Sequence, residues 1–217
     1  QAQMDEKLEF KVIEFNKDIK KFGGWHDHTL WETDTMTAHY PQRFGCYAEF
    51  DTTDHPEVMV RSGISYVDMA GASNNLSNEI TEPFGWNFEA VHKHQSDSWN
   101  NILNRVRIYS NDYREKVRFY TNLYRAFCRN TFSDADRRWV DAAGNIQKLD
   151  DPDAVALGCD AFWNTFWNLN QVWNLIAPEW SSRWVKSQLA MYDANGWLAK
   201  GPSGMKYIPV MVGEHEI

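Results

Sequence analysis

The sequence predicts an α+β fold in which a region of β-strands comes first and about five helices follow. Residues 8–15, 46–50 and 58–67 alternate apolar and polar side chains, which is typical of antiparallel strands. After Met69 the apolar residues recur every three or four positions, as on amphipathic helices. These helices lack enough partners to bury their apolar faces, so we expect a fragment or one chain of a larger assembly.

Turn-forming residues bound the predicted strands, for example Gly23-Gly24 and residues 54–56. The segment 16–39 is long, polar and rich in aromatic and His residues, so we expect a loop on the β scaffold that is either functional or merely variable. Residues 26–28 read His-Asp-His, but three sequence neighbours without a distant partner are a weak basis for a metal site. We expect a structural or surface role for them.

Predicted caps and helix-breaking residues divide the helical part into several helices. We expect, in order, a short helix at 73–80, a break at 82–85, a long helix at 88–107, a helix from a cap at 111–112 to about Cys128, a polar connector at 131–147 with a turn at 144–145, and a helix at 179–193 that Asn195-Gly196 ends.

Residues 158–178 are the densest aromatic stretch and predict a helix that is apolar over most of its circumference. Its main stripe has helical spacing and comprises Phe162, Phe166, Leu169, Trp173 and Ile176. Trp163 and Trp167 form a second stripe one residue further round. Pro178 is placed either to end this helix or to begin the next. A core helix is one interpretation, and a helix whose Trp and Asn side chains line a sugar cleft is the other.

Composition narrows the ligand classes. Aromatic residues make up 15% of the chain and eleven are Trp, and such flat amphipathic rings favour carbohydrate as the first ligand to consider. The net charge of −8 argues against nucleic acid, which needs a basic face. No run of eighteen apolar residues predicts a membrane span, and the polar amino terminus does not resemble a signal peptide. The three cysteines, in no C-x-x-C pair, support neither a disulfide framework nor a zinc site.

Six ordered segments carry a resemblance to a known family. They are FNKDIKKFGGW at 15–25, VRSGISYV at 60–67 with ASNNL at 72–76, FYTNLYRAF at 119–127 with TFSD at 131–134, SQLAMY at 187–192, NGWL at 195–198 and MVGEH at 211–215. Together they resemble glycoside hydrolase family 92, the calcium-dependent exo-acting α-mannosidases. The match runs in the family's order over nearly the whole chain.

The resemblance implies an architecture and a chemistry. Residues 1–68 would be the last strands of an amino-terminal β-sandwich, 69–112 a helical linker, and 113–217 the first helices of an (α/α)6 barrel, with the cleft at the junction. Family chemistry is inverting hydrolysis: a carboxylic acid protonates the departing oxygen, a separated carboxylate activates water, and calcium binds sugar hydroxyls. The base and the calcium ligands are expected beyond Ile217. The implied partners are a mannose-containing glycan and the rest of the protein or a companion chain.

Two departures from the family pattern concern the site. Where the family commonly reads W-D-T-F-R, this chain has Trp163-Asn164-Thr165-Phe166-Trp167, and an Asn lacks a carboxylate's paired acceptors. Where the family's N-E-T-N-C-M supplies the acid, this chain has Lys206 to Met211, so Tyr207 occupies the acid's place. A tyrosine is a poorer proton donor than a tuned Glu.

Three interpretations of these departures stay open. The protein uses another acid, such as Glu214 or Lys206, or it cleaves substrates with good leaving groups, or it has lost catalysis and only binds. Glu214 and His215 also fit a structural pair at a helix start. By resemblance, the side chains expected to contact substrate are Trp25, Trp163, Asn164, Trp167, Trp197 and His215.

The enzyme hypothesis therefore has a rival of another class, a non-catalytic glycan-binding or structural subunit on the same scaffold. Another (α/α)6 glycosidase, such as a trehalase relative, does not explain the strand motifs. The pattern Asn75-Leu76-Ser77 is a glycosylation sequon that carries little weight, because it falls within a family motif. The family's usual location implies a secreted or periplasmic protein.

Overall fold

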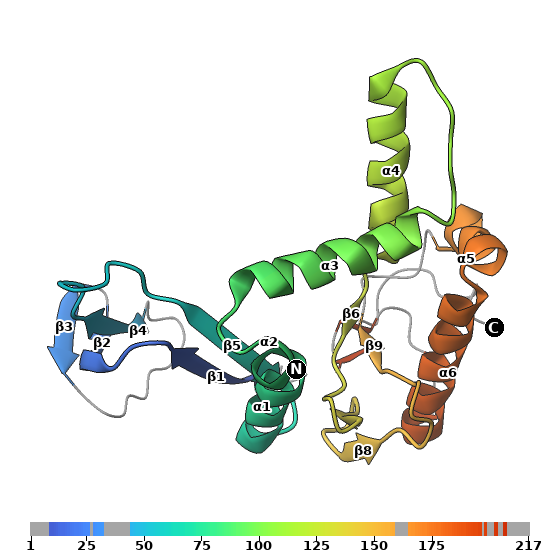
Figure 1. Cartoon of the computed structure of the whole chain (residues 1–217). Helices are drawn as coiled ribbons and strands as arrows, with labels where there is room; N and C mark the ends of the chain where they lie inside the picture. The colour runs from blue at the N-terminus through green and yellow to red at the C-terminus, as the bar shows by residue number, and fades with distance from the viewer. Residues whose placement is uncertain are drawn as a thin grey trace. The chain divides into compact units, whose positions relative to one another are not determined.

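The elements of the chain are shown in order by colour in Figure 1. The structure is a computed structural model that describes residues 9–26, 28–32, 44–158, 165–196, 198, 202–203 and 206–207. Strands occupy the first part of these residues and helices with short two-stranded ladders the rest, so the predicted α+β class is confirmed. The chain divides into a smaller unit, residues 13–62, and a larger unit formed by the remainder.

A three-stranded antiparallel sheet dominates the smaller unit. Its strands are β2 (Ile19–His26), β3 (Thr29–Glu32) and β4 (Phe44–Phe50), in the order β3-β2-β4. The prediction of one loop at 16–39 is therefore wrong at 19–26 and 29–32, whereas 27 and 33–39 lie outside the described residues. Gly23-Gly24 lies inside β2 rather than at a turn. These glycines break the alternation that marks a strand in sequence. Gly23 is required by close approach, because a Cβ there would lie 2.1 Å from the carbonyl oxygen of Trp31.

The other predicted strands are confirmed with small shifts at their ends. β1 (Phe10–Phe15) pairs with β5 (Val60–Ser65). Asn16 joins the strands where β1 ends, because its Oδ1 accepts a hydrogen bond from the backbone N–H of Met59 at 2.8 Å. An ion pair between Arg61 and Glu14, 2.6 Å long, lies across the same two strands.

A continuous helical segment follows β5 and consists of α1 (Met69–Leu76), the π-helical turn η1 (Ser77–Thr81) and α2 (Glu82–Phe84). The break predicted at 82–85 is confirmed only at Gly85, where φ is 59°. The helix continues through Pro83 because the turn before it is π-helical. In that turn the backbone N–H of Glu82 donates to the carbonyl of Ser77, five residues back. A proline ring would otherwise clash with the carbonyl four residues earlier.

Two longer helices come next, α3 (Phe88–Leu103) and α4 (Tyr113–Phe127). Asp112 caps α4 as predicted, and its carboxylate accepts a hydrogen bond from the N–H of Arg114 at 2.8 Å. Helix α3 ends at Leu103 rather than at Arg107, because residues 105 and 106 form tighter bonds to the third residue back. The rings of Trp99 and Tyr124 join the two helices with centroids 4.3 Å apart.

Three short strands interrupt the predicted polar connector, and a fourth follows it. β6 (Asn130–Thr131) pairs with β9 (Leu157–Gly158), and β7 (Arg138–Val140) pairs with β8 (Ile146–Lys148), all antiparallel. Strands of two or three residues are too short to show alternation, which is why the sequence did not reveal them. The predicted turn at 144–145 is confirmed, with Gly144 at a φ of 89°.

The aromatic stretch forms the π-helical turn η3 (Thr165–Leu169) and α5 (Asn170–Ile176), followed by α6 (Pro178–Asn195). The predicted helix does not begin at Gly158, because Leu157 and Gly158 belong to β9. Pro178 begins α6, and Gly196, at a φ of 74°, ends it as predicted. No helix in the described ranges is long and apolar enough to cross a membrane.

The hydrophobic core lies in the larger unit, where α4, α5, α6 and the short strands meet. Its large side chains include Leu123, Phe127, Phe132, Trp139, Leu149, Leu157, Trp173, Trp184 and Met191. Trp173 is 1% exposed, as the main stripe of the aromatic stretch predicts. Trp167, on the predicted second stripe, is 70% exposed. At this residue the second stripe therefore does not pack in the core.

Candidate functional site

The predicted site residues lie mainly at the carboxyl-terminal end of the chain. Trp163, Asn164, Trp197, Glu214 and His215 lie outside the described residues. Lys206 and Tyr207 form the short strand β11 (Lys206–Tyr207), which pairs antiparallel with β10 (Pro202–Ser203). In this hairpin Tyr207 is opposite Pro202 and Lys206 is opposite Ser203.

The two remaining predicted contacts are described with their side chains. Trp167 lies on η3 in the larger unit and is largely exposed. Trp25 lies on β2 in the smaller unit and is half-buried, with its ring over Gly45. A Cβ at Gly45 would lie 2.6 Å from Nε1 of Trp25, so the ring lies directly on the neighbouring strand.

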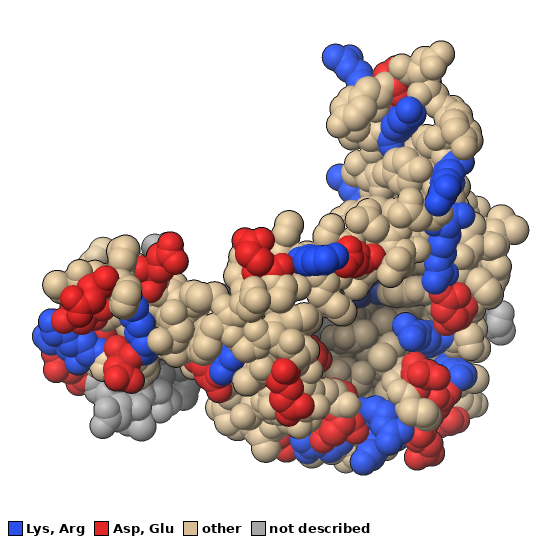
Figure 2. All heavy atoms as spheres, in the orientation of Figure 1, with Lys and Arg blue, Asp and Glu red and all other residues tan. Residues whose placement is uncertain are grey.

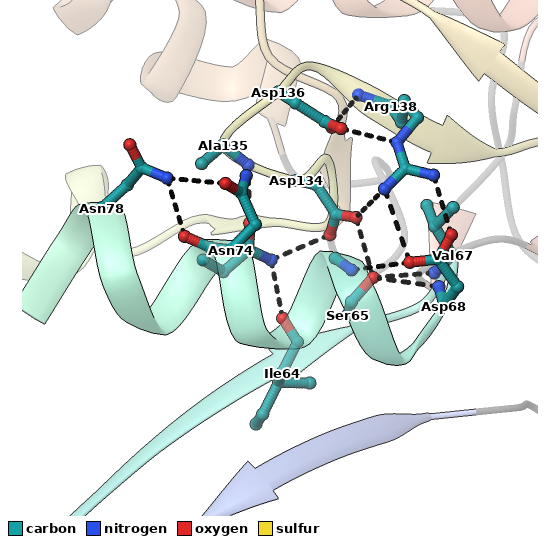
Figure 3. Close-up of polar contacts among 12 residues, drawn as sticks. Ile64, Ser65, Val67, Asp68, Asn74, Asn78, Asp134, Ala135, Asp136 and Arg138 are labelled. Atoms are coloured by element: carbon teal, nitrogen blue, oxygen red, sulfur yellow. Dashed lines mark hydrogen bonds and ion pairs between the residues drawn. The ribbon is translucent and has the colours of Figure 1, made fainter. Parts of the chain in front are cut away.

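A buried polar network centres on Asp134, and Figure 3 shows its hydrogen bonds and ion pairs. Asp134 is 5% exposed and accepts hydrogen bonds from Ser65 Oγ at 2.8 Å and from Asn75 Nδ2 at 2.9 Å. Asn75 also donates to the carbonyl of Ile64 at 2.8 Å and accepts from the N–H of Ala135 at 2.7 Å. The network joins the end of β5, helix α1 and the loop before β7.

Gly71 lets these elements approach each other. A Cβ at this position would lie 2.2 Å from Oδ2 of Asp134 and 2.7 Å from Oγ of Ser65. Because both carboxylate oxygens of Asp134 already accept hydrogen bonds and the group is buried, its arrangement suits a structural lock rather than proton transfer to a substrate.

Arg138 lies at the edge of the same network, between two carboxylates. It donates to Asp68 at 2.8 Å and to Asp136 at 2.6 Å, and its Nη2 lies 4.0 Å from Asp134. Asp68 is at the same time the N-cap of α1, accepting from the N–H of Gly71 at 2.6 Å. One arginine therefore ties a helix cap to the start of β7.

Neighbouring groups shift the pKa values of the charged residues in and near this network. Hydrogen bonds from Arg138 and from the N–H of Gly71 lower the pKa of Asp68. For Asp136, burial acts to raise the pKa, but the hydrogen bonds from the backbone and guanidinium of Arg138 lower it overall. The bonds to Asp68 and Asp136 raise the pKa of Arg138 further. Partial burial, reinforced by the negative charge of Asp134, raises the pKa of Glu79 on η1.

A second buried carboxylate holds the β7–β8 loop. Asp141 is 1% exposed and accepts from the N–H groups of Ala143 and Asn145, both at 2.9 Å, and from Gln147 Nε2 at 2.8 Å. Burial acts to raise its pKa, but these hydrogen bonds lower it overall. These donors all belong to the β7–β8 hairpin that contains Asp141, so the role of this carboxylate is to shape the turn.

An aromatic layer joins α5 to α6. The rings of Trp173 and Trp184 meet edge to face at 5.8 Å, and the guanidinium of Arg129 lies 5.5 Å and 5.6 Å from their centroids. Trp173 Nε1 donates to the carbonyl of Ala126 at 2.9 Å, which fixes α5 against the end of α4. The layer gives Arg129 two aromatic faces.

The next layer of this hairpin is polar. Asn170 precedes Trp173 by three residues and Gln188 follows Trp184 by four, so both amides lie one turn beyond the two Trp rings. Gln188 is 4% exposed, and neither of its amide atoms nor Oδ1 of Asn170 has a hydrogen-bond partner within the described part of the chain. Asn170 lies in the stretch whose Asn side chains were one predicted lining of a sugar cleft, and Gln188 lies in the SQLAMY segment, but the sequence did not predict that the two amides are buried.

Calcium, the predicted cofactor, finds no ligand set in this part of the chain. Across the residues that the structure describes, no three His, Cys, Asp or Glu side chains converge as a metal site needs. Calcium takes six to eight oxygen ligands, so the two carboxylate networks described above do not fit it. His28 is described and exposed, whereas Asp27 lies outside the described residues.

Sequence reasoning missed the Asp134 network although it had noticed the segments that carry it. ASNNL at 72–76 and TFSD at 131–134 contain Asn75 and Asp134, polar residues beside apolar ones in segments of otherwise regular pattern. That combination was the available signal for a buried polar pair. Contact across 59 residues of sequence, however, cannot be read from spacing.

Comparison with known proteins gives a consistent result. The family model described as the glycosyl hydrolase family 92 catalytic domain matches residues 71–217. The inverting mannosidase of family GH92 from Bacteroides thetaiotaomicron VPI-5482 has a similar structure, with a TM-score of 0.79 at 20% identity over 96% of this chain and 28% of that chain. No curated protein matches this sequence.

A GH92 α-mannosidase from Bacteroides thetaiotaomicron is also similar, with a TM-score of 0.75 at 24% identity over 94% of this chain and 28% of that one. Its complex with mannoimidazole gives the same TM-score and identity, over 94% of this chain and 27% of that one. Similarity at these identities shows a shared fold. The chain spans about 28% of the length of these solved proteins.

Proposed function

Because this chain belongs to glycosyl hydrolase family 92, we propose that it is part of an inverting, calcium-assisted glycoside hydrolase that cleaves α-mannosidic linkages in mannose-containing glycans. The family match over residues 71–217 is the observation that carries the proposal. Fold similarity to an inverting mannosidase at a TM-score of 0.79 supports it.

Inverting hydrolysis sets the roles that the protein must fill. One acid protonates the departing glycosidic oxygen while a carboxylate, roughly 6.5–9.5 Å away, takes a proton from the attacking water. In the proposal, the acid comes from Glu214 or Lys206, or from Tyr207 for substrates with good leaving groups. The general base and the calcium ligands come from outside this chain.

The sugar contacts belong to the same proposal. Aromatic rings pack against the apolar face of a pyranose, and amide or imidazole groups bond its hydroxyls. We assign the stacking role to Trp25, Trp163, Trp167 and Trp197, and the hydrogen-bonding role to Asn164 and His215. Trp167 is 70% exposed, as a side chain that contacts a ligand from solvent must be at least in part.

The architecture proposed for the whole protein also rests on its membership of this family. Residues 1–68 are the end of a β-sandwich, 69–112 a helical linker and 113–217 the first part of an (α/α)6 barrel. The remainder of the protein or a companion chain completes the barrel. A secreted or periplasmic location is part of the proposal.

A non-catalytic glycan-binding subunit on the same scaffold is the second candidate. Two residues favour it: Asn164 and Tyr207 stand where carboxylates are expected from the motifs around them. An Asn bonds hydroxyls but carries no charge, and a tyrosine gives up its proton less readily than a carboxylic acid. Such a site keeps its ability to bind and loses most of its rate.

Hydrolysis of aryl mannosides by the intact protein separates the two candidates. The enzyme releases phenol from an aryl α-mannoside and not from the β-mannoside, and a calcium chelator abolishes the rate until calcium is restored. A protein that binds mannoside with no release above the uncatalysed rate is the binding subunit, and the hydrolase proposal then fails.

A further inference from the structure

The strand register of the three-stranded sheet determines which side chains share a face. Trp25 on β2 is opposite Leu30 on β3 and Gly45 on β4, and Gly23 is opposite Glu32 and Tyr47. Lys21 is opposite Glu49. Because alternate residues of a strand point to the same side, these residues lie on one face of the sheet. We call it the aromatic sheet face, defined by Lys21, Gly23, Trp25, Leu30, Glu32, Gly45, Tyr47 and Glu49.

Two aromatic rings lie over glycines on this face. A Cβ at Gly45 would come within 2.6 to 2.9 Å of three atoms of the Trp25 indole. A Cβ at Gly23 would lie 2.8 Å from Cε1 and from the hydroxyl of Tyr47. Each ring therefore rests on the backbone of the neighbouring strand, where only a glycine leaves room for it. Both residues are partly buried.

Charged side chains border the rings. Lys21 and Glu32 form an ion pair of 3.0 Å, with side chains 48% and 64% exposed, and Glu49 is exposed beside them. Leu30, next to Trp25, is 68% exposed. Figure 2 shows acidic and basic side chains interspersed over this unit, whose strands lie at the left of Figure 1.

The opposite face of the same sheet has a different composition. By register it carries no Lys, Arg, Asp or Glu, and its positions are Phe22, Gly24, His26, Thr29, Trp31, Phe44, Cys46 and Ala48. In an antiparallel sheet the apolar face is the one that packs against a core and the charged face is the one that meets solvent. Phe22, at 41%, and Cys46 on this opposite face are also exposed, so exposure does not distinguish the two faces. The charged side chains do, and the rings of Trp25 and Tyr47 share their face with them.

We propose that the aromatic sheet face binds carbohydrate, with the rings of Trp25 and Tyr47 stacking on pyranose rings. Glu32, Glu49 and Lys21 bond the sugar hydroxyls around them. Rings whose planes are already fixed lose little conformational entropy on binding. The carboxylates and the ammonium group beside the rings supply acceptors and donors for the sugar hydroxyls. The inference rests on the proposed function for the nature of its ligand, which is an α-mannan.

Electrophoresis of the full chain through gels containing soluble α-mannan tests this inference. Trp25→Leu and Tyr47→Leu keep apolar bulk over Gly45 and Gly23 but remove the flat ring, so the fold is retained. We expect each substitution to weaken the apparent affinity about tenfold, because the flat ring that stacks on a sugar is lost. Glu32→Gln leaves the rings in place and alters only a hydroxyl partner, so we expect a loss of about threefold.

Trp31→Leu is the matched control, because Trp31 also lies opposite a glycine, Gly24, but on the other face. It should bind α-mannan like the parent, and all variants should melt within a few degrees of it. The inference is overturned if the parent is not retarded, if the two ring variants bind as the parent does, or if Trp31→Leu weakens binding equally. Hydrolysis of an aryl α-mannoside by the parent is scored separately, so its absence counts against the proposed function and not against the aromatic sheet face.

Discussion

Asp134 accepts a hydrogen bond from Ser65 Oγ at 2.8 Å, a contact between residues 69 positions apart in the sequence. Ser65 ends β5 and its hydroxyl also accepts from the N–H of Val67 at 2.9 Å. Through Asn75 the same carboxylate reaches α1. A single buried Asp thus holds a strand end, a helix and a loop in one arrangement, and that arrangement fixes where α1 begins.

Asp134→Ala should destabilise the protein by about 3 kcal/mol. The substitution leaves Ser65 and Asn75 buried without their acceptor, and an unsatisfied buried donor costs about 1–3 kcal/mol. Urea unfolding followed by circular dichroism measures the change. Asp153→Ala, at an exposed position, is the control and should change stability by less than about 0.5 kcal/mol. Equal effects from the two substitutions would contradict the role given to Asp134.

Asp68→Asn should reduce the loss of unfolding free energy that occurs as the pH is lowered. The pKa of Asp68 is lowered in the folded protein by Arg138 and the N–H of Gly71, so its contribution is present above its unfolded pKa and is lost as pH falls through its folded pKa. Asn keeps the N-cap and removes the titration. Because the side chain is 41% exposed, we expect a difference below about 1 kcal/mol.

Unfolding free energies at pH 7 and pH 2.5 measure this effect. The parent should lose more stability between the two than Asp68→Asn does. Asp54→Asn, at an exposed position on another part of the chain, is the control for the loss of one carboxylate. If both substitutions give the parent's slope, Arg138 does not stabilise the ionised form of Asp68.

Arg129→Gln should cost about 1–2 kcal/mol, because it removes a cation lying over two aromatic faces. Arg114→Gln on the exposed surface of α4 removes the same charge without such contacts and should be nearly neutral. The two unfolding free energies are compared in the same buffer. Similar losses from both would show that net charge matters and the Trp173–Trp184 layer does not.

The sequence predicted those elements whose pattern is local and long. Strands β1, β4 and β5, helices α3, α4 and α6, the cap at Asp112 and the stop at Gly196 all follow from periodicity and terminal residues. Strands β2 and β3 were missed because Gly23 and Gly24 interrupt the alternation. Gly23 leaves room for the ring of Tyr47 and the backbone of Trp31, a long-range requirement that has no local signature.

The candidate site was predictable only in part, for a related reason. Motif order indicated Tyr207, Asn164 and their neighbours, and the structure describes the backbone of Tyr207 in a hairpin. It did not indicate that Asp134, Asn75 and Ser65 meet, because a hydrogen-bond network depends on tertiary contacts. Polar residues without a charged cluster around them give little signal of burial in a sequence.

The proton donor can be identified by varying the leaving group. If Glu214 is the acid, Glu214→Gln should lower kcat about 10²–10⁴-fold on an α-linked mannobiose and much less on a dinitrophenyl α-mannoside, whose phenol needs no proton. Lys206→Met and Tyr207→Phe serve as comparisons. A loss that is the same on both substrates would assign Glu214 a structural role, and a selective loss in Lys206→Met or Tyr207→Phe would move the acid to that residue.

The most direct test of the central claim, that this chain is part of an inverting α-mannosidase, is the anomer released at the start of the reaction. Proton NMR of the intact protein acting on an aryl α-mannoside should show β-mannose first, with the α anomer appearing only by mutarotation. Initial release of α-mannose would contradict the inverting mechanism. Retained mannan binding without release of either anomer would contradict hydrolysis itself and identify a glycan-binding protein.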